Sequence, residues 1–334
     1  MRILWLLICC FSLYCGPLEA GPPLVPAWNA EHRLLYLDSR GAVALETDYR
    51  QGDFFDDGRA RVCGERCGFI NESGDALFGF EYYRLDSPSE GRIGFCKEEG
   101  KCGFLDLKGN VILEPVWEDV GAFSQGLAAA RRNGKWGFID GKGAWKIAPA
   151  YGSVLHFSEG LASVQSAEAP YLFGIINTSG RVVLKFSHQK IFPYSGGLAL
   201  FFHWDRFGYL DRQGQMVLTA QLEWAQNPVS GLSYFVHQNS QGYRKGRTVA
   251  FSLDCPGGTS FASEPPVVAR VQDCESGLFK YVDGSGKEWK GSFVEATEFR
   301  HGFAIVRRWK EDHYRLLDDS GEEHELRSNI LPAW

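Results

Sequence analysis

The 334-residue sequence lacks the signals of several large protein classes. It contains no GxSxG nucleophile motif, no HExxH zinc motif and no GxxxxGK[ST] phosphate loop. Its eight histidines are scattered singly, and no closely spaced acidic residues form a calcium loop. Basic residues do not predominate, because 35 Lys and Arg against 41 Asp and Glu give a net charge of −6. This balance argues against nucleic acid as a ligand, and we expect no catalytic residues, no cofactor and no metal site.

Long apolar runs are also absent after the first residues. The run from Ile3 to Tyr14 is too short for the roughly 20 residues of a spanning helix, and Ala20 offers a small residue at a cleavage site. We therefore predict a signal peptide over residues 1–20 and export to the periplasm or the exterior. Two alternatives are a lipid anchor on Cys15 and a retained N-terminal anchor. The mature chain, residues 21–334, is predicted to be one array without a transmembrane segment.

Six cysteines remain after such a cleavage, an even number that indicates disulfides in an exported chain. Sequence does not fix their pairing, but a local pairing is attractive because the first four flank two predicted hairpin turns. Free thiols and zinc are the alternatives, and zinc favours tighter CxxC pairs or interleaved histidines. The six candidates are Cys63, Cys67, Cys96, Cys102, Cys255 and Cys274.

The sequence instead contains a short motif that is repeated about nine times, most clearly as Lys135-Trp136-Gly137-Phe138-Ile139-Asp140. The mean spacing between its acidic or amide positions is 35.0 residues, which indicates a repeat array. The gaps of 43 and then 29 residues mark an irregular segment at 224–276, either a decayed repeat or a binding loop. The aligned positions are Asp38, Asn71, Asp106, Asp140, Asn177, Asp211, Asp254, Asp283 and Asp318.

Each unit is predicted to be an antiparallel meander of short strands. Asn133-Gly134 is a two-residue hairpin signal, and Asp140 begins a second turn that ends at Gly143. We therefore interpret the recurring Asp as a turn-forming residue rather than as one of a row of metal ligands. The Gly after the Trp136 position is expected where a neighbouring ring or backbone comes close.

The repeated motifs resemble those of the bacterial WG-repeat (KWG) family over most of residues 30–325. The resemblance rests on segments 135–140, 147–151 and 160–164, although Trp136 alone is a Trp at the name-giving position. It implies a β-rich repeat scaffold and brings no catalytic residues. We expect an all-β fold of tandem meanders of about 35 residues in an open or spiral array, with a closed propeller-like ring as the alternative.

One hairpin departs from the pattern with large residues, namely His203, Trp204, Asp205 and Arg206. It is either a tolerated loop variant or a projecting contact loop. We expect a non-catalytic interaction module that binds another protein, for example a secreted toxin that it neutralises. The alternatives are a carbohydrate-binding protein or glycan hydrolase of the cell envelope, and a purely structural envelope protein.

Overall fold

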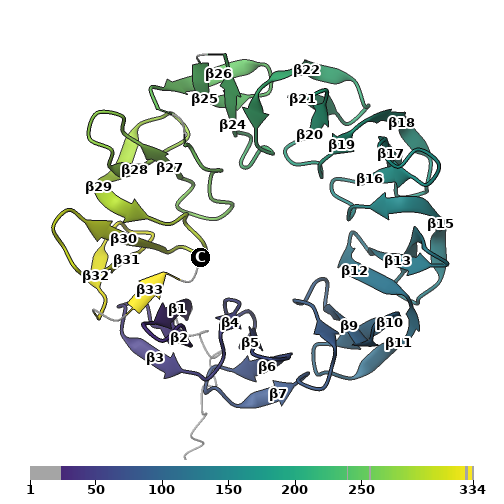
Figure 1. Cartoon of the computed structure of the whole chain (residues 1–334), viewed down its shortest axis with the longest axis horizontal. Coiled ribbons are helices and arrows are strands. Elements are labelled where there is room, and N and C mark those ends of the chain that lie inside the picture. The colour runs from purple at the N-terminus through teal and green to yellow at the C-terminus, as the bar shows by residue number, and fades with distance from the viewer. Residues whose placement is uncertain (1–23, 239, 256, 328–329, 333–334) are drawn as a thin grey trace, which may run out of the picture.

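The chain forms a ring of small antiparallel sheets around an open centre (Figure 1). The structure, a computed structural model, describes residues 24–238, 240–255, 257–327 and 330–332. Within these residues there are 33 strands and no helix, and so no helix long and apolar enough to cross a membrane. The signal-peptide prediction, with Cys15, lies outside the described residues. The predicted all-β array of antiparallel meanders is confirmed.

Nine blades make up the ring, one for each copy of the repeated sequence motif. In each blade the first strand lies nearest the centre and the last at the outside (Figure 1). The first four blades contain β33 (Ile330–Pro332), β1 (Val25–Asn29), β2 (Leu34–Leu37) and β3 (Val43–Glu46); β4 (Gln51–Gly52), β5 (Arg59–Cys63), β6 (Cys67–Asn71) and β7 (Ala76–Phe78); β8 (Arg84–Leu85), β9 (Arg92–Glu98), β10 (Lys101–Asp106) and β11 (Val111–Trp117); and β12 (Asp119–Ser124), β13 (Leu127–Arg132), β14 (Lys135–Asp140) and β15 (Trp145–Val154).

Two long strands, β15 and β29, each serve two neighbouring blades, so two of the sheets contain a pair of blades. In blade 8 the segment 259–262, which is not a strand, takes the place of the first strand through hydrogen bonds to Val268 and Arg270. Blades 5 to 9 contain the end of β15, β16 (Leu161–Ser166), β17 (Phe173–Asn177) and β18 (Val182–His188); β19 (Lys190–Ile191), β20 (Leu198–His203), β21 (Arg206–Asp211) and β22 (Met216–Leu222); β23 (Trp224–Ala225), β24 (Ser233–His237), β25 (Ser240–Lys245) and β26 (Thr248–Leu253); β27 (Ala269–Gln272), β28 (Phe279–Val282) and β29 (Glu288–Ala296); and the end of β29, β30 (Ala304–Arg308), β31 (Arg315–Leu317) and β32 (Glu323–Glu325).

The two ends of the described chain close the ring. β33 pairs with β1 in antiparallel register, with Ala27 opposite Pro332 and Asn29 opposite Ile330. The last strand thereby supplies the innermost strand of the first blade. Of the two expected arrangements, the ring is the one observed, and the preference for an open or spiral array is wrong. Closure removes the exposed sheet edges that an open array would have to cap.

The hydrophobic core lies between blades, because a single meander cannot bury both its faces. Phe138 of blade 4 packs with Phe157 and Ile176 of blade 5 in one such layer. Nine clusters of this kind follow one another around the ring. The cluster at the closure joins Val25 and Leu35 of blade 1 to Ile305 of blade 9. Side-chain packing therefore supports the closure as it supports the other blade contacts.

The predicted turn chemistry is confirmed. Asp140 Oδ1 accepts hydrogen bonds from the backbone N–H groups of Lys142 at 2.9 Å and Ala144 at 3.1 Å, and Gly143 has φ of +79°. A Cβ on Gly137 would lie 2.5 Å from the carbonyl oxygen of Ile147, so the backbone approach expected there is present. The same pair of hydrogen bonds is made by Asp38, Asn71, Asp106, Asn177, Asp211, Asp283 and Asp318.

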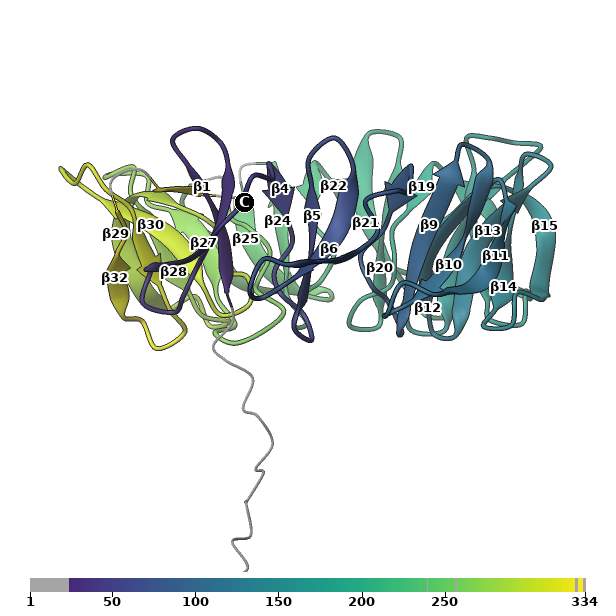
Figure 2. The ribbon, with the colours of Figure 1, turned by 90° about the horizontal axis from the view of Figure 1, so that it is seen from below.

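The connections give the ring two different faces, which appear as the two rims of a flat disc in Figure 2. Because every blade is wound alike, hairpins between second and third strands open on the same face as the links between blades. We call this the hairpin face. The turns between first and second strands, and those of the Asp140 type, lie on the opposite face, which we call the turn face.

Candidate functional site

Large aromatic side chains are exposed on the hairpin face. Four of them lie in a hairpin between second and third strands or in a link between blades, and Trp224 is the first residue of β23, directly after a link. Their exposed fractions lie between 52% and 79%, so each of these side chains is open to solvent. Exposed aromatic rings on one face are typical of interaction surfaces. The residues are Tyr83, Tyr171, Trp204, Trp224 and Trp309.

The predicted contact loop has the same left-handed backbone as its counterpart in blade 4, but different residues form it. Trp204 and Asp205 form the tip of the β20–β21 hairpin with φ of +48° and +61°. In blade 4, Asn133 and Gly134 hold the same positions with φ of +52° and +72°. A bulky residue in the left-handed region is a conformational outlier and costs about 1–2 kcal/mol. This chain therefore keeps an unfavourable turn that displays the Trp204 ring.

The surroundings of the loop hold it in place. The Trp204 N–H donates to Gln189 Oε1 at 2.8 Å, and Arg206 forms an ion pair with Glu223 at 3.2 Å. The Phe207 ring packs edge-on against Trp224, with centroids 5.6 Å apart. We name Trp204, Arg206, Phe207, Glu223 and Trp224 the contact cluster. Sequence reasoning missed the part played by Glu223 and Trp224, although Trp224 begins the segment where the period fails.

On its other side the loop is backed by two histidines. His203 lies with its ring 5.5 Å from Trp204 and 5.7 Å from the buried His188. Burial, and next the charge of His203, lower the pKa of His188 below its usual 6.5. His188 Nδ1 lies 2.9 Å from Ser187 Oγ. The neutral imidazole of His188 thus forms part of the support under the loop.

The irregular segment at 224–276 is not a loop insertion. It forms blade 7 and the first part of blade 8 up to β27, and Tyr234, Tyr243 and Val271 are buried in one core layer. The interpretation as a decayed repeat is therefore the one the structure favours. Near the end of the segment, Asp273 holds a related turn through hydrogen bonds from Ser276.

Three disulfides lie on the hairpin face. Cys63 is bonded to Cys67 and Cys96 to Cys102, each pair across a hairpin between second and third strands. Cys255, after β26, is bonded to Cys274 in the next blade. The pairs agree with the local solution expected from the sequence, and they fit an oxidising compartment.

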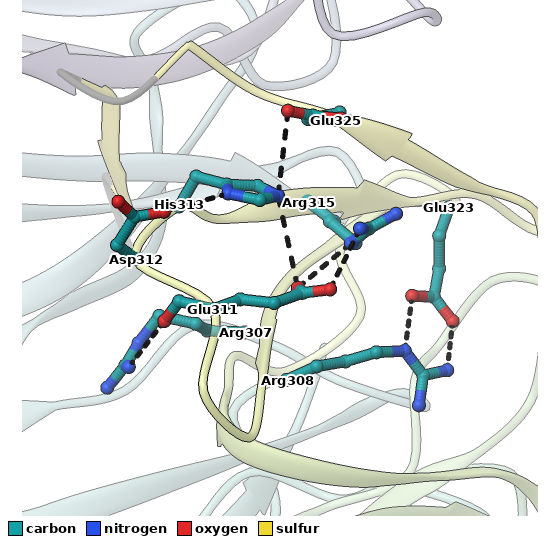
Figure 3. Close-up of polar contacts among 8 residues, drawn as sticks. All are labelled: Arg307, Arg308, Glu311, Asp312, His313, Arg315, Glu323 and Glu325. Atoms are coloured by element: carbon teal, nitrogen blue, oxygen red, sulfur yellow. Dashed lines mark hydrogen bonds and ion pairs between the residues drawn. The ribbon is translucent and has the colours of Figure 1, made fainter.

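Blade 9 carries a dense network of charges (Figure 3). Arg308 binds Glu323 through two hydrogen bonds, and Arg315 binds Glu311 in the same way at 2.8 and 3.0 Å. Hydrogen bonds from Arg315 lower the pKa of Glu311. Burial alone would raise the pKa of Glu323, but Arg308 and neighbouring cations outweigh it and lower that pKa. Since these charges satisfy one another, we interpret the network as support for the blade beside the closure.

His313 lies inside this network. Its Nε2 is 3.7 Å from Glu325 and 4.0 Å from Glu311, while its Nδ1 is 3.2 Å from Asp312 (Figure 3). Elsewhere in the described ranges, two groups of three potential metal ligands occur. In one, Cys96 and Cys102 are joined in a disulfide. In the other, Asp318 already binds His324 at 2.8 Å and its own turn.

The turn face is hollowed at the ring closure. A cavity of about 610 Å³ opens there, lined by residues of blades 8, 9, 1, 2 and 3, and we name it the closure pocket. A second of about 300 Å³ shares Glu264, Arg300 and His301 with it. The pocket is lined by Pro26, Gly52, Asp53, Phe54, Phe55, Asp56, Arg59, Arg61, Phe69, Ser87, Pro88, Glu264, Arg300 and His301.

The blades and their turns together define a β-propeller-like repeat protein. Residues 103–136, 136–166, 173–202 and 207–240 match the family model described as WG containing repeat. The chain therefore carries four tandem WG repeats between β10 and β25, and the resemblance inferred from the sequence is confirmed there.

Comparison with whole proteins gives evidence about the fold and about nothing else. No curated protein matches the chain. The crystal structure of a eukaryotic initiation factor is similar over 94% of this chain and 99% of that one, with a TM-score of 0.60 and 13% identity. BamB from Moraxella catarrhalis matches with a TM-score of 0.46 and 12% identity, over 81% of this chain and 91% of that one.

Proposed function

We propose that this protein is an exported, non-catalytic binding module that holds another protein on its hairpin face. The observation that carries the proposal is the contact cluster. Trp204 is 75% exposed at a turn whose left-handed backbone is unfavourable for a bulky residue. The exposed Trp224 lies beside Phe207 in the same cluster. Trp and Arg are the residues that contribute most at protein interfaces, and a rigid hairpin offers them at little entropic cost.

A carbohydrate-binding protein or glycan hydrolase is the second candidate, because sugars also stack on aromatic rings. Such a site would place rings beside paired carboxylates in a groove. The exposed rings of the hairpin face line none of five cavities found among the described residues. Rings on projecting hairpins fit the surface of a protein better than a glycan chain, which favours the protein partner.

The proposed compartment rests on the disulfides. Three disulfides support an oxidising environment, and we propose the periplasm or the exterior, with a lipid anchor through Cys15 as the alternative. A secreted toxin that the ring neutralises is one partner of this kind. Such a toxin would present an apolar patch with a cation for Glu223 and an acidic group for Arg206.

The experiment is an affinity capture from envelope extract with two baits, the mature chain from Gly21 and its Trp204→Asn variant. We expect one stoichiometric protein on the first bait and at least about tenfold less on the second, since interface tryptophans contribute 2 kcal/mol or more. A matched control, Trp309→Asn, removes an exposed ring in blade 9 and should retain the partner. Equal capture by all three baits, or capture of glycan alone, would contradict the proposal.

A further inference from the structure

The outer circumference of blades 4 to 6 carries exposed apolar side chains. They follow the last strands of these blades, β15, β18 and β22, which lie at the outside of the ring (Figure 1). Val182 and Phe186 of β18 are 50% and 37% exposed, and Met216 at the start of β22 is 51% exposed. None of the three lines any of the five cavities named above, so they form part of an open surface rather than of a groove.

Cations alternate with these apolar side chains. Lys146 belongs to β15, Arg181 directly precedes β18, and Lys185 lies next to Phe186. All three cations are exposed, and none has a carboxylate oxygen within 4.0 Å among the described residues. Hydrogen bonds of its own turn, and then the charge of Lys146, lower the pKa of Asp140, so that carboxylate is already engaged. We name the outer band as Lys146, Arg181, Val182, Lys185, Phe186 and Met216.

Contacts between blades make the outer band continuous. The turn of the Asp140 type in each of these blades packs on the outer strand of the blade before it. A Cβ on Gly180 would lie 3.4 Å from Ile147 Cγ1, and a Cβ on Gly214 would lie 3.1 Å from Leu184 Cβ. Members of the outer band lie within two residues of each of these four positions. The band therefore runs from blade 4 through blade 5 to blade 6.

The strands of the outer band are poor sites for an added strand of another protein. β15, β18 and β22 each have two register shifts against the strand inside them, and Pro149 lies within β15. Bulges and prolines protect a sheet edge from strand addition. A second copy of this chain would bring like charges together across the contact. A lipid surface needs no hydrogen-bond register, and apolar side chains mixed with Lys and Arg suit its interface.

The opposite side of the ring has different charges (Figure 1). There the outer strands β32 and β3 expose Glu325 and Glu46, while Lys290 and Arg308 are both paired with Glu323. An anionic surface would attract the outer band and repel this acidic side, so the charge distribution would orient the ring. The disc would then meet such a surface with its circumference rather than with either of its faces (Figure 2).

We propose that the outer band docks the ring on a lipid surface with anionic head groups. The cations of the band bind the phosphate groups of the lipids, while its apolar side chains enter the boundary between head groups and acyl chains. The hairpin face and the turn face both stay accessible in this orientation. The contact cluster can therefore hold its partner while the ring lies at a membrane, although neither site depends on the other.

Vesicle flotation tests the proposal with the mature chain from Gly21. One set of vesicles contains phosphatidylglycerol and phosphatidylcholine in equal parts, and the other contains phosphatidylcholine alone. We expect binding to the first set that weakens as salt is added, and at least about tenfold weaker binding to the second. Lys146→Gln, Arg181→Gln and Lys185→Gln together should weaken binding about a hundredfold, since each cation near an anionic surface contributes about 1 kcal/mol, or about fivefold.

Two controls separate the outer band from general properties of the chain. Arg40→Gln, Lys287→Gln and Lys310→Gln together remove the same charge from exposed positions in blades 1, 8 and 9, and this variant should bind as the parent does. For the apolar part, Met216→Gln should weaken binding at least about threefold. Leu77→Gln, at a residue that is 47% exposed in blade 2, should not.

Absence of binding, equal binding to both sets of vesicles, or equal loss in the two triple variants would overturn the proposal. A dimer in sedimentation equilibrium that the outer-band triple variant separates would assign the band to a second copy and would also overturn it. The Trp204→Asn variant should float with the vesicles as the parent does. Loss of the protein partner without loss of flotation would therefore tell failure of the contact cluster from failure of the outer band.

Discussion

The imidazole ring of His301 lies 4.2 Å from the phenyl ring of Phe54, measured between centroids, at an interplanar angle of 38°. Phe54 belongs to blade 2 and His301 to the turn of blade 9, so this contact crosses blade 1 at the ring closure. A carboxylate oxygen of Glu264 lies 3.6 Å from Nδ1 of the same imidazole. The closure thus rests on this ring pair as well as on the pairing of β33 with β1.

Replacing Phe54 by Ala should weaken the closure. We expect a loss of about 1–2 kcal/mol in unfolding free energy, since an aromatic pair contributes about 0.5–1.5 kcal/mol beyond the area it buries. Hydrogen exchange should speed up in β1 and β33 before the rest of the ring. Phe192→Ala, in blade 6, is the control. It should lower stability without this local effect, and equal exchange in the two variants would refute the closing role of Phe54.

The recurring Asp can be tested as a turn former. Asp140→Ala removes two backbone hydrogen bonds and should cost about 1–2 kcal/mol, whereas Asp140→Asn should cost little, because Asn71 and Asn177 make the same bonds. The measurement is urea unfolding of both variants at neutral pH. If the Asn variant were as unstable as the Ala variant, the charge of Asp140 would be needed for stability, which would contradict its interpretation as a turn-forming residue.

Local chemistry explains why the repeat could be predicted and the ring could not. Asp140, Gly143 and Asn133-Gly134 act within a few residues, so their turns follow from sequence alone. The closure depends on a three-residue strand, Ile330–Pro332, that finds its partner some 300 residues away in the sequence. In the sequence, residues 24–28 (Leu-Val-Pro-Ala-Trp) are similar to residues 331–334 (Leu-Pro-Ala-Trp), but this likeness alone does not tell two caps from two ends that pair.

The contact site shows the same limit. His203 to Arg206 stood out because large residues replace a turn signal, and this is a local feature. Glu223 lies in the next link between blades and pairs with Arg206, while Trp224 begins β23 and contacts the Phe207 ring. The closure pocket could not be predicted, because its walls come from both ends of the sequence.

The disulfides should differ in their contributions. Chain entropy favours the longer loop, so replacing both Cys255 and Cys274 by Ser should cost about 3 kcal/mol, and replacing Cys63 and Cys67 about 2 kcal/mol. The first pair also ties blade 7 to blade 8. Guanidinium unfolding of the two double variants measures the difference. A larger loss from the Cys63 and Cys67 pair would contradict the entropic account.

His188 should make stability depend on pH. Its pKa is lowered in the folded protein, so the unfolded chain takes up a proton first as the pH falls. The contribution of the neutral His188 to stability is therefore complete above pH 6.5 and is lost as the pH falls from 6.5 through the lowered folded pKa. Melting curves at pH 7.5 and 5.5 should show a smaller drop in the His188→Gln variant than in the parent. An unchanged drop would assign the effect to other groups.

The strongest test of the contact loop separates stability from binding. Changing Trp204 to Asn and Asp205 to Gly installs the turn that blade 4 already has at Asn133 and Gly134. Because both new residues accept a left-handed backbone, the unfolding free energy should rise by about 1–2 kcal/mol. The same change removes the exposed ring, so the partner captured on the hairpin face should be lost. A residue kept only for folding cannot give this opposite pair of effects, and a variant that is less stable and still binds would show that Trp204 serves the fold.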